Sequence, residues 1–170
     1  MDEASNAKGH VYMTSEEFAR RVEALRPTLY RICRSELSVA ADREDAVQEA
    51  VLRAWRRRDS LREMRYFNTW FIRILVNICH DIQRQQGRVV PTEAPPEPPP
   101  RRDDRVQALR EAMDALEEKQ RLCLLLHHIE GYSVKEVAAM LGIGESAVKQ
   151  RLMRGRRKLR ELLSEEVFGK

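Results

Sequence analysis

The residues best suited to a chemical task lie near the C-terminus, where seven basic side chains follow one another with no acid between them. They are Lys149, Arg151, Arg154, Arg156, Arg157, Lys158 and Arg160. Ammonium and guanidinium groups along a helix suit the phosphates of a nucleic acid, and side chains at the start of that helix can reach base edges. A solvated basic surface is the simplest interpretation of a charge run, but the segment that precedes this one favours DNA binding.

That preceding segment predicts a short capped helix and a tight turn. Ser133 and Glu136 have the spacing of a capping box, and Gly142 supplies the backbone freedom that ends a helix. A second helix is expected from about Glu145 or Ser146, with a buried stripe at steps of three and four residues. The stripe comprises Val148, Leu152, Gly155, Leu159 and Leu163. Together the two helices have the build of a helix-turn-helix whose second helix enters the major groove.

Other kinds of chemistry find no support in the sequence. No glycine-rich phosphate loop follows a strand, and the patterns HExxH, GxSxG and CxxC do not occur, so no catalytic residues and no cofactor are expected. The pairs His127–His128 and Cys79–His80 could suggest metal ligands, but neighbouring side chains on a helix point about 100° apart. We therefore expect no metal site. Cys33, Cys79 and Cys123 are widely spaced in helical patterns and are expected to be reduced and buried.

The charge distribution indicates contact with a polyanion at several places. The balance of 31 basic and 27 acidic residues gives a net charge of only +4, but the basic residues cluster in 53–65, 84–102 and 149–160. No apolar run has the length of a membrane span, and the first ten residues lack the apolar core of a secretory signal. The sequence thus predicts a cytoplasmic protein without membrane insertion.

The prolines divide the chain into two halves. Six of the seven lie between Pro91 and Pro100, where no regular helix can form. We expect a disordered N-terminus at 1–13, a helical domain at 14–86, a Pro-rich linker at 87–104 and a second helical domain at 105–170. No strand pattern occurs, so the fold class is all-α, with two small helical domains and a helix-turn-helix in the C-terminal one.

The N-terminal half contains three predicted helices. Thr14 and Glu17 have capping-box spacing before the first helix, which Pro27 is expected to kink or divide. The second helix is expected at about 43–57, with Asp42 as N-cap, and a basic loop at 56–65 follows it. The third, at 67–86, has a strongly periodic core face. Its expected core residues are Phe67, Trp70, Phe71, Ile74, Leu75, Ile78 and Ile82.

Two more helices are expected between the linker and the helix-turn-helix. Their apolar positions are Val106, Leu109, Met113 and Leu116 for the first, and Leu122, Leu125, Leu126 and Ile129 for the second.

Two polar strips in the N-terminal half are ordinary surface when each is taken alone. The second helix carries Asp45, Gln48, Glu49, Leu52 and Arg53 on one side. The third carries Arg73, Asn77, Asp81 and Arg84, of which the last three lie one turn apart and can hydrogen-bond in series.

Taken together, the blocks DAVQEAVLRAW (45–55), FNTWFIRILVNICHDIQR (67–84) and SAVKQRLMRGRRKLRELL (146–163) resemble the group-IV, extracytoplasmic-function sigma factors of bacterial RNA polymerase. The resemblance covers 14–86 and 104–165 and includes the Pro-rich joint. It implies that the first half is a region-2 domain and the second half a region-4 domain, and that the chain directs transcription initiation by core polymerase.

The resemblance also implies roles for individual residues. Asp45, Gln48, Glu49 and Arg53 would dock on the clamp helices of the largest polymerase subunit, and the flap would be a further polymerase contact. Arg73, Asn77, Asp81 and Arg84 would handle the melted non-template strand of the minus-10 element, where bases are captured on their exposed edges. The duplex minus-35 element would be read by Ser146, Lys149, Gln150, Met153, Arg154 and Arg157. An anti-sigma factor is a further partner that the family pattern leaves open.

The sequence departs from the family pattern at two places. A proline usually follows the position of Leu116, and Glu117 stands there instead, so a less sharp joint between the fourth and fifth helices is expected. The recognition helix usually reads Thr-Val-Lys-Ser-Arg, whereas 147–151 reads Ala-Val-Lys-Gln-Arg. Phosphate contact at Ala147 would then fall to its backbone amide, and Gln150 could bond adenine through two hydrogen bonds.

Two other classes of function compete with this interpretation. A free-standing helix-turn-helix regulator would use the N-terminal half for dimerisation or sensing, but it would not need the polar strip at 73–84 beside a basic loop. A DNA-processing enzyme such as a recombinase would need a catalytic serine or tyrosine, and none stands in a recognisable setting.

Overall fold

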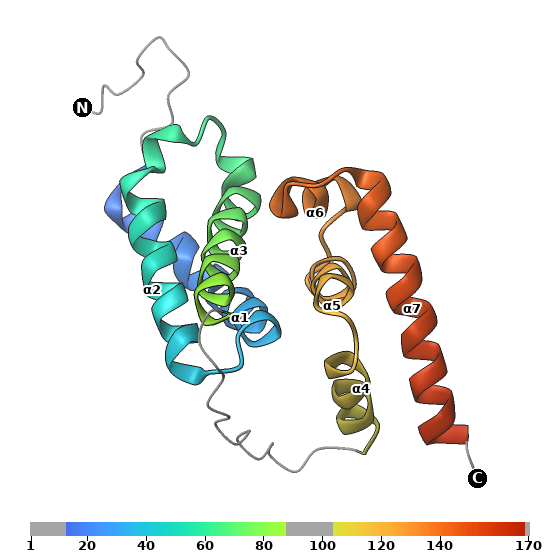
Figure 1. Ribbon diagram of the computed structural model, residues 1–170. Coiled ribbons are helices and arrows are strands. Elements are labelled where there is room, and N and C mark those ends of the chain that lie inside the picture. The colour runs from blue at the N-terminus through green and yellow to red at the C-terminus, as the bar shows by residue number, and fades with distance from the viewer. Residues whose placement is uncertain (1–12, 88–103, 169–170) are drawn as a thin grey trace.

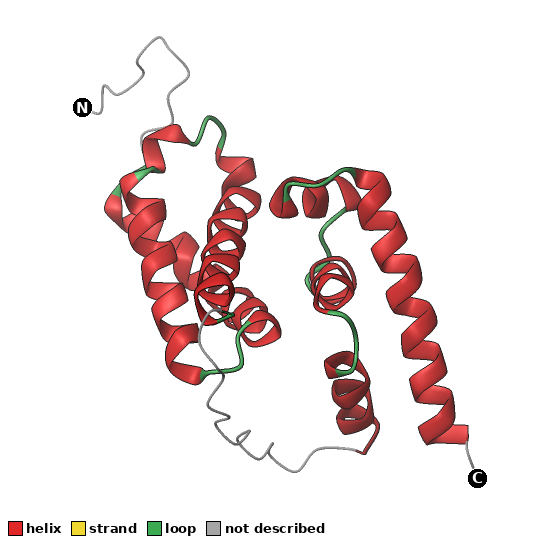
Figure 2. Ribbon diagram, in the orientation of Figure 1, coloured by secondary structure: helices red, strands yellow, loops and turns green. Residues whose placement is uncertain are grey.

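The computed structural model describes residues 13–87 and 104–168, with the backbone alone described at a few positions near the ends of the second range. Within these ranges the chain is built from α-helices and short helical turns and contains no strand, which confirms the all-α prediction (Figure 2). None of the helices in these ranges combines the length and the apolar character that crossing a membrane would require. The expected disorder at 1–13 and the linker at 87–104 fall almost wholly outside the described residues.

The N-terminal helical group contains three long helices (Figure 1). These are α1 (Ser15–Glu36), α2 (Ala40–Arg56) and α3 (Phe67–Gln86), with two 3-10 turns, Arg58–Ser60 and Met64–Tyr66, between α2 and α3. The aromatic rings of Phe18, Phe67 and Phe71 meet in its core, with ring centroids 5.7 to 6.4 Å apart. Such edge and tilted contacts add to the burial of apolar area that holds the three helices together.

The C-terminal group comprises α4 (Asp104–Asp114), α5 (Glu118–Leu124), α6 (Val134–Leu141) and α7 (Glu145–Phe168). A π-helical turn, Leu125–Ile129, extends α5. A less sharp joint between α4 and α5 was expected because Glu117 replaces the usual proline, but the two helices are separated by a clear break. Glu117 has φ −57°, close to the angle that a proline ring imposes, so the backbone turns without one.

Helix α3 lies at the centre of the molecule, because α2 packs on one side and α6 on another (Figure 1). The predicted residues Phe67, Phe71 and Leu75 are fully buried, and Ile74 and Ile78 nearly so. Trp70 and Ile82 are only partly buried. Ile72 and Val76 were not predicted as core, yet they are fully buried, as is Cys79, whose burial was predicted. The amphipathic pattern of α3 predicted one buried face, whereas the structure buries two faces of this helix.

Three local predictions for the N-terminal group differ from the structure at least in part. Pro27 does not divide α1, which continues through it to Glu36; Pro27 is exposed. Helix α2 begins three residues earlier than predicted, and Val39 rather than Asp42 occupies the N-cap. The Asp42 carboxylate instead accepts a hydrogen bond of 2.5 Å from the Gln86 amide of α3. The expected basic loop at 56–65 contains the two 3-10 turns.

Several apolar residues predicted to form the cores of the fourth and fifth helices are solvent-exposed. Val106 is 43% and Leu109 45% exposed, and Ile129 at the end of the π-helical turn is 57% exposed. With Met113 and Leu159 they line a groove of about 710 Å³, whose lining also includes Arg31, Arg34, Arg110 and Arg156. We call this the apolar groove.

Polar contacts connect the two helical groups. The Glu130 carboxylate, whose side chain is 6% exposed, accepts hydrogen bonds from Arg31 Nε at 2.5 Å and Thr28 Oγ1 at 2.5 Å. The Arg121 guanidinium donates from Nη2 to the carbonyl oxygen of Ser35 at 2.8 Å. The sequence predicted separately folded halves, and the structure places them in direct contact.

Replacing Glu130 with Gln is expected to lower the free energy of unfolding by about 1 to 3 kcal/mol at neutral pH, because Arg31 and Thr28 lose a charged acceptor. Burial raises the pKa of Glu130, but the hydrogen bonds from Arg31 and Thr28 outweigh it and leave the pKa below its ordinary value of 4.5. A carboxylate with a lowered pKa stabilises the fold above the unfolded pKa and loses that contribution as the pH falls through the folded pKa. The difference between wild type and variant should therefore shrink below about pH 4.

Urea unfolding of the full chain at several pH values measures this difference. The matched control is Glu23→Gln, because Glu23 forms an exposed ion pair with Arg26 at 3.3 Å on the same helix, α1, to which Glu130 binds. An exposed pair of this kind contributes about 0.5 kcal/mol or less. Equal effects of the two substitutions would show that the contact between the groups adds nothing beyond a surface ion pair.

Candidate nucleic-acid interface

The helix-turn-helix is formed by α6 and α7, and its local geometry follows the sequence closely. Glu136 N donates to Ser133 Oγ at 3.3 Å, and Ser133 N donates to the Glu136 carboxylate at 2.8 Å, which completes the capping box. Gly142 ends α6 with φ +66°, a left-handed conformation that disfavours other residues. Both predictions are confirmed.

Helix α7 packs against α5 through its apolar stripe. Val148 and Leu152 are buried, and Gly155 lies so close to α5 that a Cβ placed there would be 2.8 Å from Leu124 Cδ1. Leu159 and Leu163 are partly buried. The glycine allows close approach of the two helices, and this contact fixes which side of α7 faces solvent.

The opposite side of α7 presents the residues predicted to read a DNA duplex. Those exposed are Ser146, Lys149, Gln150, Met153, Arg154 and Arg157. Met153 is 57% exposed, which leaves it available for contact with a base or sugar. Arg157 lies 3.9 Å from Glu161 one turn on, an exposed pair that a phosphate could readily replace.

The polar strip of α2 is also exposed and contains an apolar residue. Asp45 and Gln48 are exposed, and Leu52 between them and the end of the helix is 48% exposed. Glu49 accepts a hydrogen bond of 2.6 Å from Arg53 Nε. An exposed leucine among acidic groups has the composition of a protein-docking surface, since the burial of one apolar anchor and charge complementarity then act together.

The polar strip of α3 adjoins the strip of α2. Arg73, Asn77 and Arg84 are exposed and Asp81 is half-buried. Asp81 forms an ion pair with Arg84, and its other oxygen lies 3.9 Å from Arg53 Nη1. Arg53 therefore connects the two strips, a contact between helices that no pattern in the sequence indicates.

The strip of α3 faces the C-terminal group across a groove of about 760 Å³, which we call the interdomain groove. Asn77, Asp81 and Arg84 line one side, and the facing residues are Lys119, Leu122, Leu141, Ile143 and Arg151. Arg73 reaches toward the turn after α6, since a Cβ built on Gly142 would be 4.0 Å from its guanidinium. Three of the four predicted site residues on α3 thus share one groove.

An exposed aromatic residue beside this strip was missed by the sequence analysis. Tyr66, just before α3, is 48% exposed, and the Arg65 guanidinium lies 4.8 Å from its ring centroid. A ring and a guanidinium plane at the same place suit the stacking of an unpaired base. The signal in the sequence was an aromatic residue between the predicted basic loop at 56–65 and the predicted third helix.

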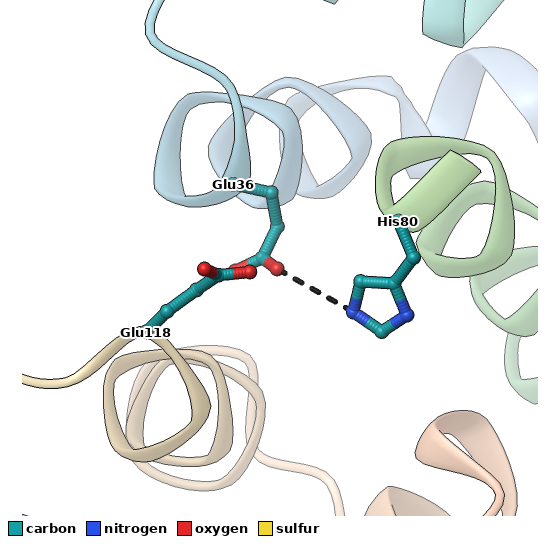
Figure 3. Close-up of side chains that lie close together, drawn as sticks. All are labelled: Glu36, His80 and Glu118. Atoms are coloured by element: carbon teal, nitrogen blue, oxygen red, sulfur yellow. Dashed lines mark ion pairs between the residues drawn. The ribbon is translucent and has the colours of Figure 1, made fainter. Parts of the chain in front are cut away.

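A buried carboxyl group lies at the edge of the interdomain groove. The Glu36 side chain is 1% exposed, and its Oε2 lies 3.8 Å from His80 Nε2 (Figure 3). Burial, and to a lesser extent the neighbouring Glu118, raises the pKa of Glu36 to about 8. The sequence does not reveal the cluster of Glu36, His80 and Glu118, because these residues come from three helices far apart in the chain.

Family comparisons agree with the division into two helical groups. Residues 21–89 match the family described as Sigma-70 region 2, and residues 106–159 match the family described as Sigma-70, region 4. The first match contains the strips of α2 and α3, and the second contains the helix-turn-helix.

Full-length relatives and solved structures are similar over most of the chain. The ECF RNA polymerase sigma factor SigM of Mycobacterium tuberculosis is 32% identical over 165 residues, covering 94% of this chain and 82% of that protein. The RNA polymerase sigma-E factor of Streptomyces coelicolor is 30% identical over 154 residues, with 86% of each covered. The sigma factor RpoE in its complex with the anti-sigma factor NepR from Bartonella quintana superposes with a TM-score of 0.76 at 26% identity, covering 88% of this chain and 98% of that one. CnrH in complex with the cytosolic domain of CnrY gives a TM-score of 0.65 at 28% identity, covering 89% and 90%.

Proposed function

Since this chain belongs to the extracytoplasmic-function sigma factors of the sigma-70 family, we propose that its exposed strips divide the work of transcription initiation among α2, α3 and α7. The observation that carries the proposal is the exposed basic face of α7 on a helix-turn-helix, accompanied in the same chain by a polar strip on α3. A duplex reader and a single-strand reader on one chain suit a protein that first finds a promoter and then opens it.

The α2 strip is assigned to core polymerase. Asp45, Gln48, Glu49 and Arg53 surround Leu52 and would dock on the clamp helices of the largest subunit, with Leu52 as apolar anchor. The acidic groups would meet basic residues of the partner, which sets orientation and speeds association. The flap of the polymerase is assigned to the C-terminal group.

The α3 strip is assigned to the melted non-template strand at the minus-10 element. Asn77 offers an amide that can bond an exposed base edge, and Arg73 and Arg84 offer guanidinium groups for the backbone or for stacking. Tyr66 supplies a ring face at the edge of this strip. Asp81 holds Arg84 in place through their ion pair.

The face of α7 is assigned to the duplex minus-35 element. Lys149 and Gln150 lie near the helix N-terminus, where base edges come within reach, and Ser146 and Met153 flank them. Arg154 and Arg157 follow further along and suit phosphates.

An anti-sigma factor is proposed as a regulatory partner, because two structural neighbours were solved in complexes of this kind, RpoE with NepR and CnrH with CnrY. The apolar groove of this chain, with Val106, Leu109 and Ile129 exposed beside five arginines, suits an acidic amphipathic helix. The chain would act in the cytoplasm, where core polymerase and DNA are found, as an initiation factor rather than a catalyst.

Run-off transcription tests the function. Purified core polymerase with this chain should give a defined transcript from a cognate promoter, and core polymerase alone should give none. A chain that binds the promoter duplex tightly by itself and adds nothing to core polymerase would instead be a free-standing regulator.

Replacing Asn77 with Ala is expected to slow open-complex formation, because its proposed target exists only after the strands separate. The defect should shrink on a template already opened across the minus-10 element. Fluorescence of a reporter base in the minus-10 segment measures opening on both templates, and Gln85→Ala is a matched control because Gln85 is an exposed amide on the same helix. Equal defects on both templates, or none on either, would contradict a role of Asn77 in base capture and indicate that it is an ordinary surface residue.

A further inference from the structure

Three side chains from three helices converge at the edge of the interdomain groove (Figure 3). Glu36 comes from the end of α1, His80 from α3 and Glu118 from the start of α5. One carboxylate oxygen of each glutamate and one imidazole nitrogen all lie within 4.8 Å of one another. These three atoms belong to the groups that bind divalent transition metals in proteins.

The Glu36 carboxylate supplies an independent reason to expect a ligand. Its Oε2 is buried and has no hydrogen-bond partner, whereas Oε1 accepts a bond of 3.3 Å from Ser35 Oγ. In the ionised form that binds a cation, a buried carboxylate oxygen without a donor is costly, and such atoms are rare in native structures. Figure 3 shows this carboxyl group pointing into the space between His80 and Glu118. A cation in that space would compensate the orphaned oxygen.

We propose that Glu36, His80 and Glu118 form a binding site for one divalent transition-metal ion, with Zn²⁺ as the favoured species. Two carboxylates, one imidazole and one water complete the four-coordinate shell that Zn²⁺ adopts readily. Mg²⁺ and Ca²⁺ fit less well, because they prefer oxygen ligands alone and more of them. His80 and Glu118 are not buried, so their side chains can close on the ion from their present spacing.

The surroundings support such a site. All three ligands line the interdomain groove, which gives an ion a path from solvent. Gln83 Nε2 donates to Glu118 Oε1 at 2.7 Å and to the carbonyl oxygen of Glu36 at 2.8 Å. An outer hydrogen bond of this kind orients a ligating carboxylate.

The bound ion would join the two helical groups of the chain. Two of its ligands belong to the N-terminal group and the third to the C-terminal group. The proposal does not depend on the assigned roles in transcription, since binding of the ion is measured on the free protein.

The test uses the full chain without an affinity tag, freed of metal by a chelator. Equilibrium dialysis against Zn²⁺ should give one ion per chain at this site. His80→Ala and Glu118→Gln should each weaken binding by about 10-fold or more. The matched controls are Glu117→Gln and His128→Ala, which alter an exposed neighbour and another imidazole and should leave the affinity unchanged.

A second possible metal site consists of the buried thiols of Cys33 and Cys79, which interact with each other nearby. The absorption spectrum of bound Co²⁺ distinguishes the two sites. The expected Co²⁺ spectrum has ligand-field bands without a thiolate charge-transfer band. Circular dichroism of each variant confirms that it is folded, and Glu118→Gln decides the matter if His80→Ala disturbs the fold. A thiolate band, no binding at one ion per chain, or an affinity unaffected by Glu118→Gln would overturn the proposal.

Discussion

Replacing Asp45 with Arg and Leu52 with Ala in one variant is expected to weaken binding to core polymerase about 100-fold, which corresponds to about 2.7 kcal/mol. The Leu52→Ala substitution removes an apolar anchor that is 48% exposed in the free chain. The Asp45→Arg substitution places a positive charge where it repels a basic partner surface. Asp45 is a cleaner site for charge reversal than Glu49. Glu49 holds Arg53, and Arg53 in turn lies beside Asp81 of the α3 strip, so its loss would disturb both strips.

Fluorescence anisotropy of the labelled chain, titrated with core polymerase, measures this affinity. Glu23→Arg makes the same change of charge at an exposed position of α1 and should bind core polymerase as the wild type does. The free energy of unfolding in urea should change by only about 0.5 kcal/mol in both variants, because the substituted side chains are solvent-exposed. Wild-type affinity of the Asp45→Arg/Leu52→Ala variant would remove α2 as the docking face.

Replacing Gln150 with Ala is expected to cost about 1 to 3 kcal/mol on the preferred minus-35 sequence, a loss of about five- to 150-fold. Preference should relax at one base position only, because the amide can form two hydrogen bonds with a single adenine. The assay is competition among promoters that differ at single minus-35 positions, with core polymerase present. A uniform loss over all positions would contradict base reading by Gln150.

Arg157→Ala is the matched contrast on the same helix. Its side chain lies further along α7 and is expected to meet a phosphate, so all promoter sequences should weaken alike. The slope of log affinity against log salt should fall by about one unit. A change of sequence preference in this variant, with no change of slope, would indicate that Arg157 contacts bases rather than phosphates.

The elements that the sequence predicted best are those whose signals are local. The capping box of Ser133 and Glu136, the left-handed Gly142 and the stripe of α7 each depend on contacts within a few residues. Helix α3 was found with the correct bounds because its apolar period is strong. The family pattern then supplied the candidate residues on α2, α3 and α7, and the structure found nearly all of them exposed.

The features that the sequence did not reveal depend on contacts between distant segments. Ile72 and Val76 are buried because α6 packs on a second face of α3, which no period within α3 encodes. Asp42 was predicted to cap α2, but its carboxylate accepts a hydrogen bond from Gln86, 44 residues away in the sequence. The sequence places Cys79 beside His80 as a potential metal ligand, but its side chain points in another direction on the helix. In the structure, the groups beside His80 are Glu36 and Glu118.

The position of the α3 strip inside the interdomain groove has a consequence for affinity. A DNA strand that contacts both Asn77 and Asp81 inside this groove would require the two helical groups to move apart, since residues of α5, α6 and α7 supply the facing wall. The apparent dissociation constant is then the intrinsic one divided by the fraction of open molecules, so an open fraction of about 1% would weaken binding about 100-fold. A polymerase that binds only the open conformer shifts that equilibrium and restores the lost affinity. Free chains would therefore leave single-stranded DNA alone, and sequence-specific capture would begin once the holoenzyme has assembled.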